Sequence, residues 1–189
     1  AVTVVAQPAD YDGVLQSLRE QGALPPDQRR KLAATAFAHT ANYDAQIAMY
    51  LNTCDDDLFP QELALPLARI QTMRYGENPH QRAAFYRWRA PGGVAHATLA
   101  EAETLHGKQL GYNNIMDIDA ALNVVRDFAD PAATIIKHAA PCGIAVAASP
   151  EAAFRRALAG DPVSAYGGII GLNRPVDLAT AQAIRESHF

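Results

Sequence analysis

Apolar residues recur along the chain at spacings that change near residue 55. From residue 25 to residue 54 they return every three or four positions, which is the period of one face of an α-helix. This pattern predicts a long helix that opens at Pro25-Pro26-Asp27. Its continuous apolar stripe consists of Leu32, Ala36, Phe37, Thr40, Tyr43, Ile47 and Tyr50. Before it, residues 2–6 predict a short buried strand, and a helix that starts near Pro8 should stop at Gly22.

Beyond an acidic linker, Asp55-Asp56-Asp57 with Pro60, short strands should alternate with helices. Strands are predicted within 63–73, 83–88, 133–137, 144–147 and 168–172. Helices should start at Asn113 or Asn114, at Ser149-Pro150 with a stop at Gly160, and at Asp177. This alternation predicts the α/β fold class, with layers of helix and sheet.

Composition narrows the function classes. The 189 residues are 49% apolar and 19% charged, enough for one good-sized core, and the net charge of −4 with no basic stripe argues against a nucleic-acid partner. No apolar run approaches the roughly 20 residues that span a bilayer, so no membrane partner is expected. Two distant cysteines fit a cytoplasmic location. The chain opens without Met inside a predicted strand and stops inside a predicted helix, so we expect a fragment.

The most informative chemistry lies at 135–143, where a β-branched run ends on Lys137 and His138, just before Pro141-Cys142-Gly143. In open α/β sheets ligands bind beyond the carboxyl ends of the strands. Successive strand residues point to opposite faces, so both side chains reach one site only if the strand breaks there. His138 is suited to accepting a proton near neutrality. We therefore predict that Lys137 and His138 are catalytic.

Three polar stretches are weaker candidates. The loop at 74–81 combines Arg74, Tyr75 and His80 with amides on a Gly/Pro frame, and it fits an ordinary turn as well as a ligand site. The segment 105–114 lacks a Walker ending and is more typical of a connecting loop before a helix. The segment 161–168, with Gly167, fits a tight turn or a close backbone approach to a ligand.

The Pro141-Cys142 region is open to two rival interpretations. A zinc deaminase needs Pro-Cys-x-x-Cys, but Ala145 stands where the second thiolate would be, so no metal is expected. Cys142 beside His138 could act as a nucleophile, although no third orienting group can be named from the sequence.

Four motifs in order make the chain similar to a known family. They are Arg-Tyr-Gly-Glu-Asn-Pro-His-Gln at 74–81, Leu-His-Gly-Lys-Gln-Leu-Gly-Tyr-Asn-Asn at 105–114, Lys-His-Ala-Ala-Pro-Cys-Gly at 137–143 and Asp-Pro-Val-Ser-Ala-Tyr-Gly-Gly at 161–168. Together they resemble the bifunctional enzymes that join phosphoribosylaminoimidazolecarboxamide (AICAR) formyltransferase to IMP cyclohydrolase. The resemblance spans the whole chain, which covers only the middle of the family's length.

The resemblance implies a fold and an activity. Residues 1–57 would be the end of an MGS-like cyclohydrolase domain with its linker, and 58–189 the first part of a cytidine-deaminase-like formyltransferase domain. The family moves a formyl group from 10-formyltetrahydrofolate, its co-substrate, to the 5-amino group of AICAR, and then cyclises the product to IMP. A homodimer is implied as well. The alternative is a non-catalytic fragment that serves only as an association or scaffold piece.

The resemblance also implies roles for individual residues. His138 would accept the proton of the amine and Lys137 would stabilise the transition state. Arg74 and Tyr75 would hold the nucleotide, and Gly167 would contact it through its backbone. The same motifs make His80 and Asn113 further substrate-binding candidates. Two positions depart from the usual pattern: Ala140 stands where bacterial relatives usually have Asn, and Tyr166 replaces a usual Phe, so we expect altered rates rather than inactivity.

Overall fold

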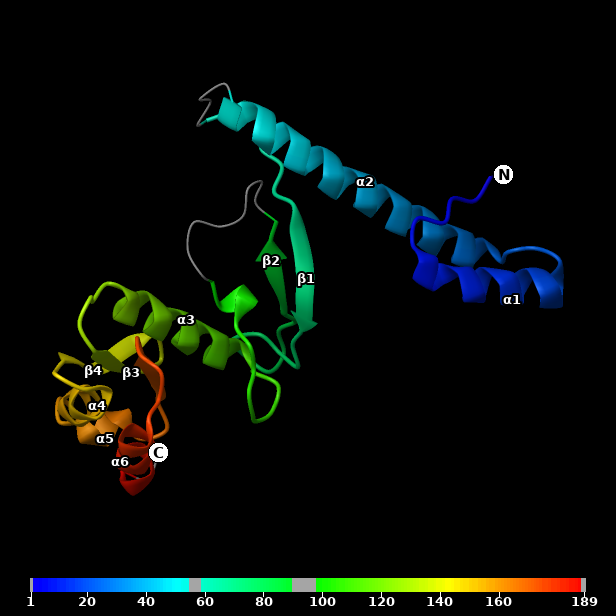
Figure 1. Cartoon of the computed structure of the whole chain (residues 1–189). Helices are drawn as coiled ribbons and strands as arrows, with labels where there is room; N and C mark the ends of the chain where they lie inside the picture. Colours follow the sequence, from blue (N-terminus) through cyan, green and yellow to red (C-terminus); the bar gives the residue numbers. More distant parts are fainter. Residues whose placement is uncertain (1, 55–58, 90–97, 188–189) are drawn as a thin grey trace. The chain divides into compact units, whose positions relative to one another are not determined.

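A computed structural model of the chain describes residues 2–54, 59–89 and 98–187 (Figure 1). These residues form two compact units. The first takes in the chain up to Ala68 and a short piece from Tyr86, and the second takes in Arg69–Phe85 and the C-terminal part. The predicted linker Asp55-Asp56-Asp57 lies outside the described residues, together with the predicted boundary between 57 and 58.

The first unit is helical, as its apolar spacing predicts. A 3-10 turn, η1 (Pro8–Asp10), leads into α1 (Tyr11–Gln21), and Gly22 ends that helix with a left-handed φ of 69°. The longest helix, α2, spans Pro26–Cys54. The two helices are joined by side chains, because Ser17 Oγ donates to Gln28 Oε1 at 2.8 Å and Gln28 Nε2 donates to the Gly13 carbonyl at 3.1 Å.

One expectation for this region is wrong. Residues 2–6 form no strand among the described residues, and Val2 and Val4 are 95% and 58% exposed. The apolar stripe of α2 is present, but in this structure the helix buries only Leu32 and Ala45 among its residues. Phe37 is 76% exposed. The apolar periodicity predicted the helix correctly. It does not tell which surface would cover the apolar face of that helix.

A two-stranded sheet joins β1 (Leu67–Thr72) to β2 (Ala84–Trp88), so both predicted strands are confirmed, the first with a later start. Just beyond the sheet, the Met73 N–H donates to the Ala83 carbonyl at 3.0 Å. The connection between the strands is the polar loop of residues 74–81. A 3-10 turn, η2 (Leu99–Glu101), comes before the next helix.

A three-stranded sheet has the order β4-β3-β5, from β3 (Ala132–Lys137), β4 (Ala140–Val146) and β5 (Ile169–Leu172). Both neighbours run antiparallel to β3. The strands confirm a mixed α/β structure, but β3 does not lead into a helix at its carboxyl end. The chain instead reverses at once, with Lys137 opposite Ala140, so β3 and β4 form a hairpin.

Helices cover both faces of this sheet. On one face lies α3 (Tyr112–Arg126), so close that a side chain added at Gly171 would meet the Ala121 Cβ at 2.9 Å. The other face is covered by α4 (Pro150–Leu158) and the four-residue α5 (Pro162–Ala165), and α6 (Leu178–Glu186) packs against α4. The core on that side contains Ala133, Ile135, Ala153, Phe154, Ala157, Ala165 and Ala183.

Local capping explains where these helices start. The predicted caps are confirmed at Ser149, which accepts a hydrogen bond from the Ala152 N–H, and at Asp177, which accepts one from the Thr180 N–H. The predicted Asn113 or Asn114 cap is wrong, because α3 already starts after Gly111. Asn114 lies inside the first turn, and its Oδ1 accepts from the Gly111 N–H at 3.3 Å. Among the described residues, no helix is both long and apolar enough to cross a membrane.

Candidate functional site at the β3–β4 hairpin

The tip of the β3–β4 hairpin is a two-residue turn made of His138 and Ala139. Both have positive φ, 54° and 59°. This is the pattern of a type I′ turn, whose twist suits a hairpin and whose preferred residues are Asn and Gly. Left-handed backbone costs other residues about 1–2 kcal/mol each. The chain therefore carries strain at the position where it presents His138, which is a recurrent property of functional sites.

Alternation along β3 sends the two polar side chains to different faces. Ala133 and Ile135 belong to the core under α4, so Lys137 continues on that face. Its Nζ donates to the Tyr166 carbonyl at 2.8 Å, immediately before Gly167, whose φ is 72°. An ammonium group has three donors, so this bond fixes the position of the charge and leaves capacity for a ligand.

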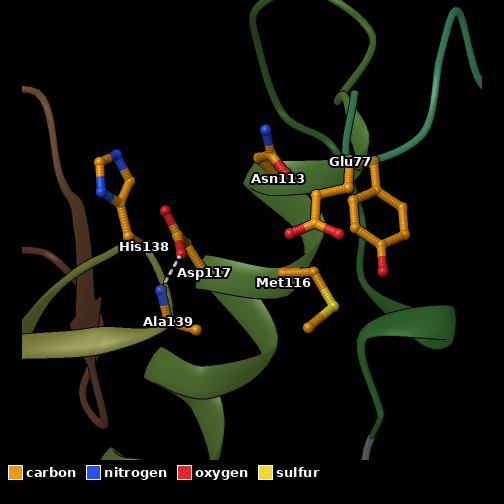
Figure 2. Close-up of a pocket in the computed structure, with 7 residues that line it drawn as sticks. Glu77, Asn113, Met116, Asp117, His138 and Ala139 are labelled. Atoms are coloured by element: carbon orange, nitrogen blue, oxygen red, sulfur yellow. Dashed lines mark hydrogen bonds between the residues drawn. The ribbon is translucent and has the colours of Figure 1, made fainter. Parts of the chain in front are cut away.

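His138 turns toward α3. It lines a hollow of about 440 Å³ whose walls come from the hairpin tip, the first turns of α3 and the 74–81 loop. Figure 2 shows these side chains gathered around the opening, with Asp117 between His138 and Asn113. The lining residues are Glu77, Tyr112, Asn113, Met116, Asp117, His138 and Ala139. Their mixture of carboxylates, an amide, an imidazole and apolar surface is typical of a small-molecule site.

The hairpin tip is tied to α3 by a short hydrogen bond. The Ala139 N–H donates to Asp117 Oδ1 at 2.7 Å, shown as the dashed line in Figure 2. Bonds to a carboxylate are stronger than bonds between neutral groups. The strained turn is therefore held by a charge on the neighbouring helix.

A second hollow, of about 430 Å³, lies on the Lys137 side, and His138 lines it as well. Asp161 and Ser164 of the α5 region and Cys142 of β4 take part in its walls. The Ser164 N–H donates to Asp161 at 2.9 Å and holds the pKa of that carboxyl below its usual range. His138 thus borders both hollows, while Lys137 borders only this one.

The structure places the remaining predicted residues at different distances from this chemistry. Asn113 lines the first hollow with His138. Arg74, Tyr75 and His80 lie on the exposed 74–81 loop and are not among the described residues that line that hollow. The loop reaches it through Glu77 instead. Backbone bonds shape the loop: the Gly76 N–H donates to the Gln81 carbonyl at 2.9 Å.

The described residues offer no added support for the two rival interpretations, a zinc site and a Cys142 nucleophile. Within the part of the chain that the structure describes, no group of three or more His, Cys, Asp and Glu side chains is placed to hold a metal ion. Cys142 lines the second hollow, but among the described residues no hydrogen bond joins its thiol to the His138 ring.

Comparison with known proteins decides the family. The family model of the AICARFT/IMPCHase bienzyme matches residues 1–189. The chain belongs to this family. The sequence-based resemblance is thereby confirmed at the level of the family.

Three relatives of the chain share the name bifunctional purine biosynthesis protein PurH. The protein of Myxococcus xanthus is 52% identical over 187 residues, which cover 98% of this chain and 36% of the relative. That of Persephonella marina is 46% identical over the same share of each chain. That of Bacillus subtilis is 47% identical over 183 residues, 97% of this chain and 35% of the relative. The chain therefore spans about a third of the length of these relatives.

Sequence reasoning missed five of the residues that line the first hollow: Glu77, Tyr112, Met116, Asp117 and Ala139. Helical spacing could have indicated two of them. Met116 and Asp117 follow Asn113 by three and four positions, so all three share one face of α3. Glu77 lies within the motif at 74–81, but no sequence signal separates it from its neighbours.

Proposed function

We propose that the protein transfers a formyl group from 10-formyltetrahydrofolate to the 5-amino group of AICAR, and that the intact protein also cyclises the product to IMP. Family membership supports this proposal. The observation that carries it is the position of Lys137 and His138: a cation at the end of β3 and, next to it, a base on the strained turn, with both bordering the second hollow and His138 bordering the first as well. Two substrates that must meet at one reacting centre need such an arrangement.

The chemistry defines what the site must supply. The 5-amino nitrogen is a poor nucleophile because its lone pair is conjugated with the imidazole ring and its carboxamide. As this nitrogen bonds to the formyl carbon, it must lose a proton, and the formyl oxygen gains negative charge. The bond from the formyl carbon to the folate nitrogen then breaks, and that nitrogen leaves with a proton. A general base and an oxyanion stabiliser are therefore required.

Lys137 and His138 are suited to these two roles. An imidazole can accept a proton near neutral pH, so His138 would take the proton of the amine. The Lys137 ammonium, tethered to the Tyr166 carbonyl, would face the growing charge on the formyl oxygen. Because His138 borders both hollows, it could reach a nucleotide on one side and a folate on the other.

The substrate-binding roles follow the family motifs. Arg74 and Tyr75 would hold the nucleotide, since a guanidinium fork suits phosphate. His80 would assist from the same loop, and Asn113 would offer its amide inside the first hollow. Gly167 would approach the nucleotide through its backbone. As a glycine it has no side chain in the way, and it adopts its left-handed φ without strain.

The same proposal extends to organisation. Residues 1–57 would be the end of an MGS-like cyclohydrolase domain, and residues 58–189 the first part of a cytidine-deaminase-like transferase domain. The intact protein would be a cytoplasmic homodimer. Family membership supports both statements.

A direct assay tests the function. The intact protein, incubated with AICAR and 10-formyltetrahydrofolate, should form the formylated nucleotide and tetrahydrofolate in equal amounts, measured by chromatography and absorbance. Absence of product with a folded protein would contradict the proposal and favour the alternative, a non-catalytic association piece.

A further inference from the structure

We propose that Asp117 is a positioning residue: its carboxylate holds the His138–Ala139 turn in the left-handed conformation that aims the His138 ring. The inference rests on the proposed function for its activity readout, but its structural basis is independent. It concerns one bond, from the Ala139 N–H to Asp117 Oδ1 at 2.7 Å.

The left-handed conformation of the turn needs a stabilising contact from outside the hairpin. Lys137 and Ala140 form the last pair of the β3–β4 ladder, so His138 and Ala139 lie beyond the hydrogen bonds of the sheet. Neither residue is a glycine, and both have positive φ. Side chains disfavour that region, and such conformations persist only where surrounding contacts determine them. Among the described residues, the contact that reaches the backbone of this turn from outside the hairpin is Asp117.

The backbone of Asp117 is held in a well-packed part of the structure. It lies in the second turn of α3, a helix packed on β3 and β5. The same sheet carries the hairpin, so both ends of the bond belong to one packed unit. Groups placed on helices hold their geometry better than groups on loops.

The location of Asp117 links its hydrogen bond with Ala139 to the position of the His138 ring. Both line the first hollow, and Figure 2 shows the second carboxylate oxygen of Asp117 pointing away from Ala139. Without the bond, the turn can relax toward conformations that its residues prefer, and the His138 ring moves with its backbone. A displacement of about 1 Å at a reacting group can lower a rate by about a hundredfold.

Two substitutions in the intact protein separate this role from a direct chemical one. Asp117→Ala removes the acceptor and should lower kcat for formyl transfer by about 10- to 100-fold, with a smaller change in the KM of AICAR. Asp117→Asn keeps an acceptor oxygen and should recover activity to within about threefold of wild type. Asp119→Ala, which removes a carboxylate from the exposed side of the same helix, is the matched control.

Glycine at the turn provides the rescue. Ala139→Gly makes the left-handed conformation available without a side-chain penalty, so it should restore most of the kcat that Asp117→Ala loses. A direct role of the carboxylate in substrate binding or proton transfer would not be rescued in this way. Unchanged kcat in Asp117→Ala, or a loss that Ala139→Gly does not reduce, overturns the inference.

A second readout does not depend on activity. Hydrogen exchange of the Ala139 amide should become at least about tenfold faster in Asp117→Ala, because its acceptor is gone and the turn opens locally. If wild type forms no formylated product while exchange responds as expected, the proposed function fails and the positioning role stands. Equal exchange in wild type and variant overturns the positioning role.

Discussion

The helix pair α1 and α2 and the sheet β4-β3-β5 with its helices use apolar residues in opposite ways. In the sheet region, Ile135 and Phe154 are fully buried. In α2, a helix of 29 residues, the described burial is limited to Leu32 and Ala45, and Phe37 lies exposed. The sheet region therefore owes its order to its own core, whereas much of the apolar stripe of α2 is exposed in the described part of the chain, at Phe37, Tyr43, Ile47 and Tyr50.

This difference shows that a catalytic site needs rigid packing around it, whereas a helix can form without such packing. The candidate site lies wholly in the second unit, where packed layers fix the strained turn of His138. A long helix can form from its periodicity and length without providing such rigid support. Substitutions of the same residue type in the two regions should therefore have very different effects.

The largest contrast is expected for histidine. His138→Ala should lower the turnover of formyl transfer by about two to four orders of magnitude, since it removes the proposed general base. His39→Ala, on the exposed surface of α2, is the matched substitution and should leave turnover unchanged. Steady-state kinetics at saturating substrates measures both. Equal effects of the two variants would remove His138 from its proposed role.

Phenylalanine tests the packing difference. Phe154→Ala empties a fully buried position and should lower the free energy of unfolding by about 3–5 kcal/mol. Phe37→Ala should change it by no more than about 0.5 kcal/mol, as expected for an exposed side chain. Denaturant unfolding of the intact protein gives both values. A large loss for Phe37→Ala would show that another surface covers α2 in the intact protein.

Arginine tests substrate binding. Arg74→Ala should raise the KM of AICAR roughly tenfold or more, because a charged hydrogen bond contributes about 1.5–3 kcal/mol, while kcat changes little. Arg29→Ala, on α2, serves as the control. A change confined to the KM of the folate would contradict the assignment of Arg74 to the nucleotide.

The smallest effect concerns acid stability. The hydrogen bond from Ser164 lowers the pKa of Asp161 below its ordinary value of 3.8 in the folded state. A lowered folded pKa means that the carboxylate stabilises the fold above 3.8 and that this contribution is lost as the pH falls through the folded pKa. Asp161→Asn should therefore weaken the loss of stability on acidification, measured as the unfolding free energy against pH. Identical pH slopes in wild type and variant would contradict this.

Sequence reasoning succeeded where the signal was local. Gly22, Ser149 and Asp177 were predicted to bound helices, and each does so through its own backbone or side-chain bond. Such bonds connect residues a few positions apart, so they leave a clear pattern in the sequence.

The features that the sequence did not predict depend on contacts that are not local in the chain or on a turn without its usual residues. The β3–β4 hairpin was not predicted, because its turn residues, His138 and Ala139, lack the Asn-Gly signal of a type I′ turn. Helical spacing could have placed Asp117 beside Asn113, but it could not predict the bond of Asp117 to Ala139, which lies 22 positions away. The strand expected at 2–6 would need a partner strand, which periodicity alone cannot supply. Non-local pairing therefore accounts for what the sequence left open at the site.

The most direct test of the central claim is the crystal structure of the intact protein with AICAR bound. The account predicts that the 5-amino nitrogen lies about 2.6–3.2 Å from a ring nitrogen of His138, the reach of a general base. A nucleotide bound away from the β3–β4 hairpin, with its amine beyond the reach of His138 even through one water, would contradict the account.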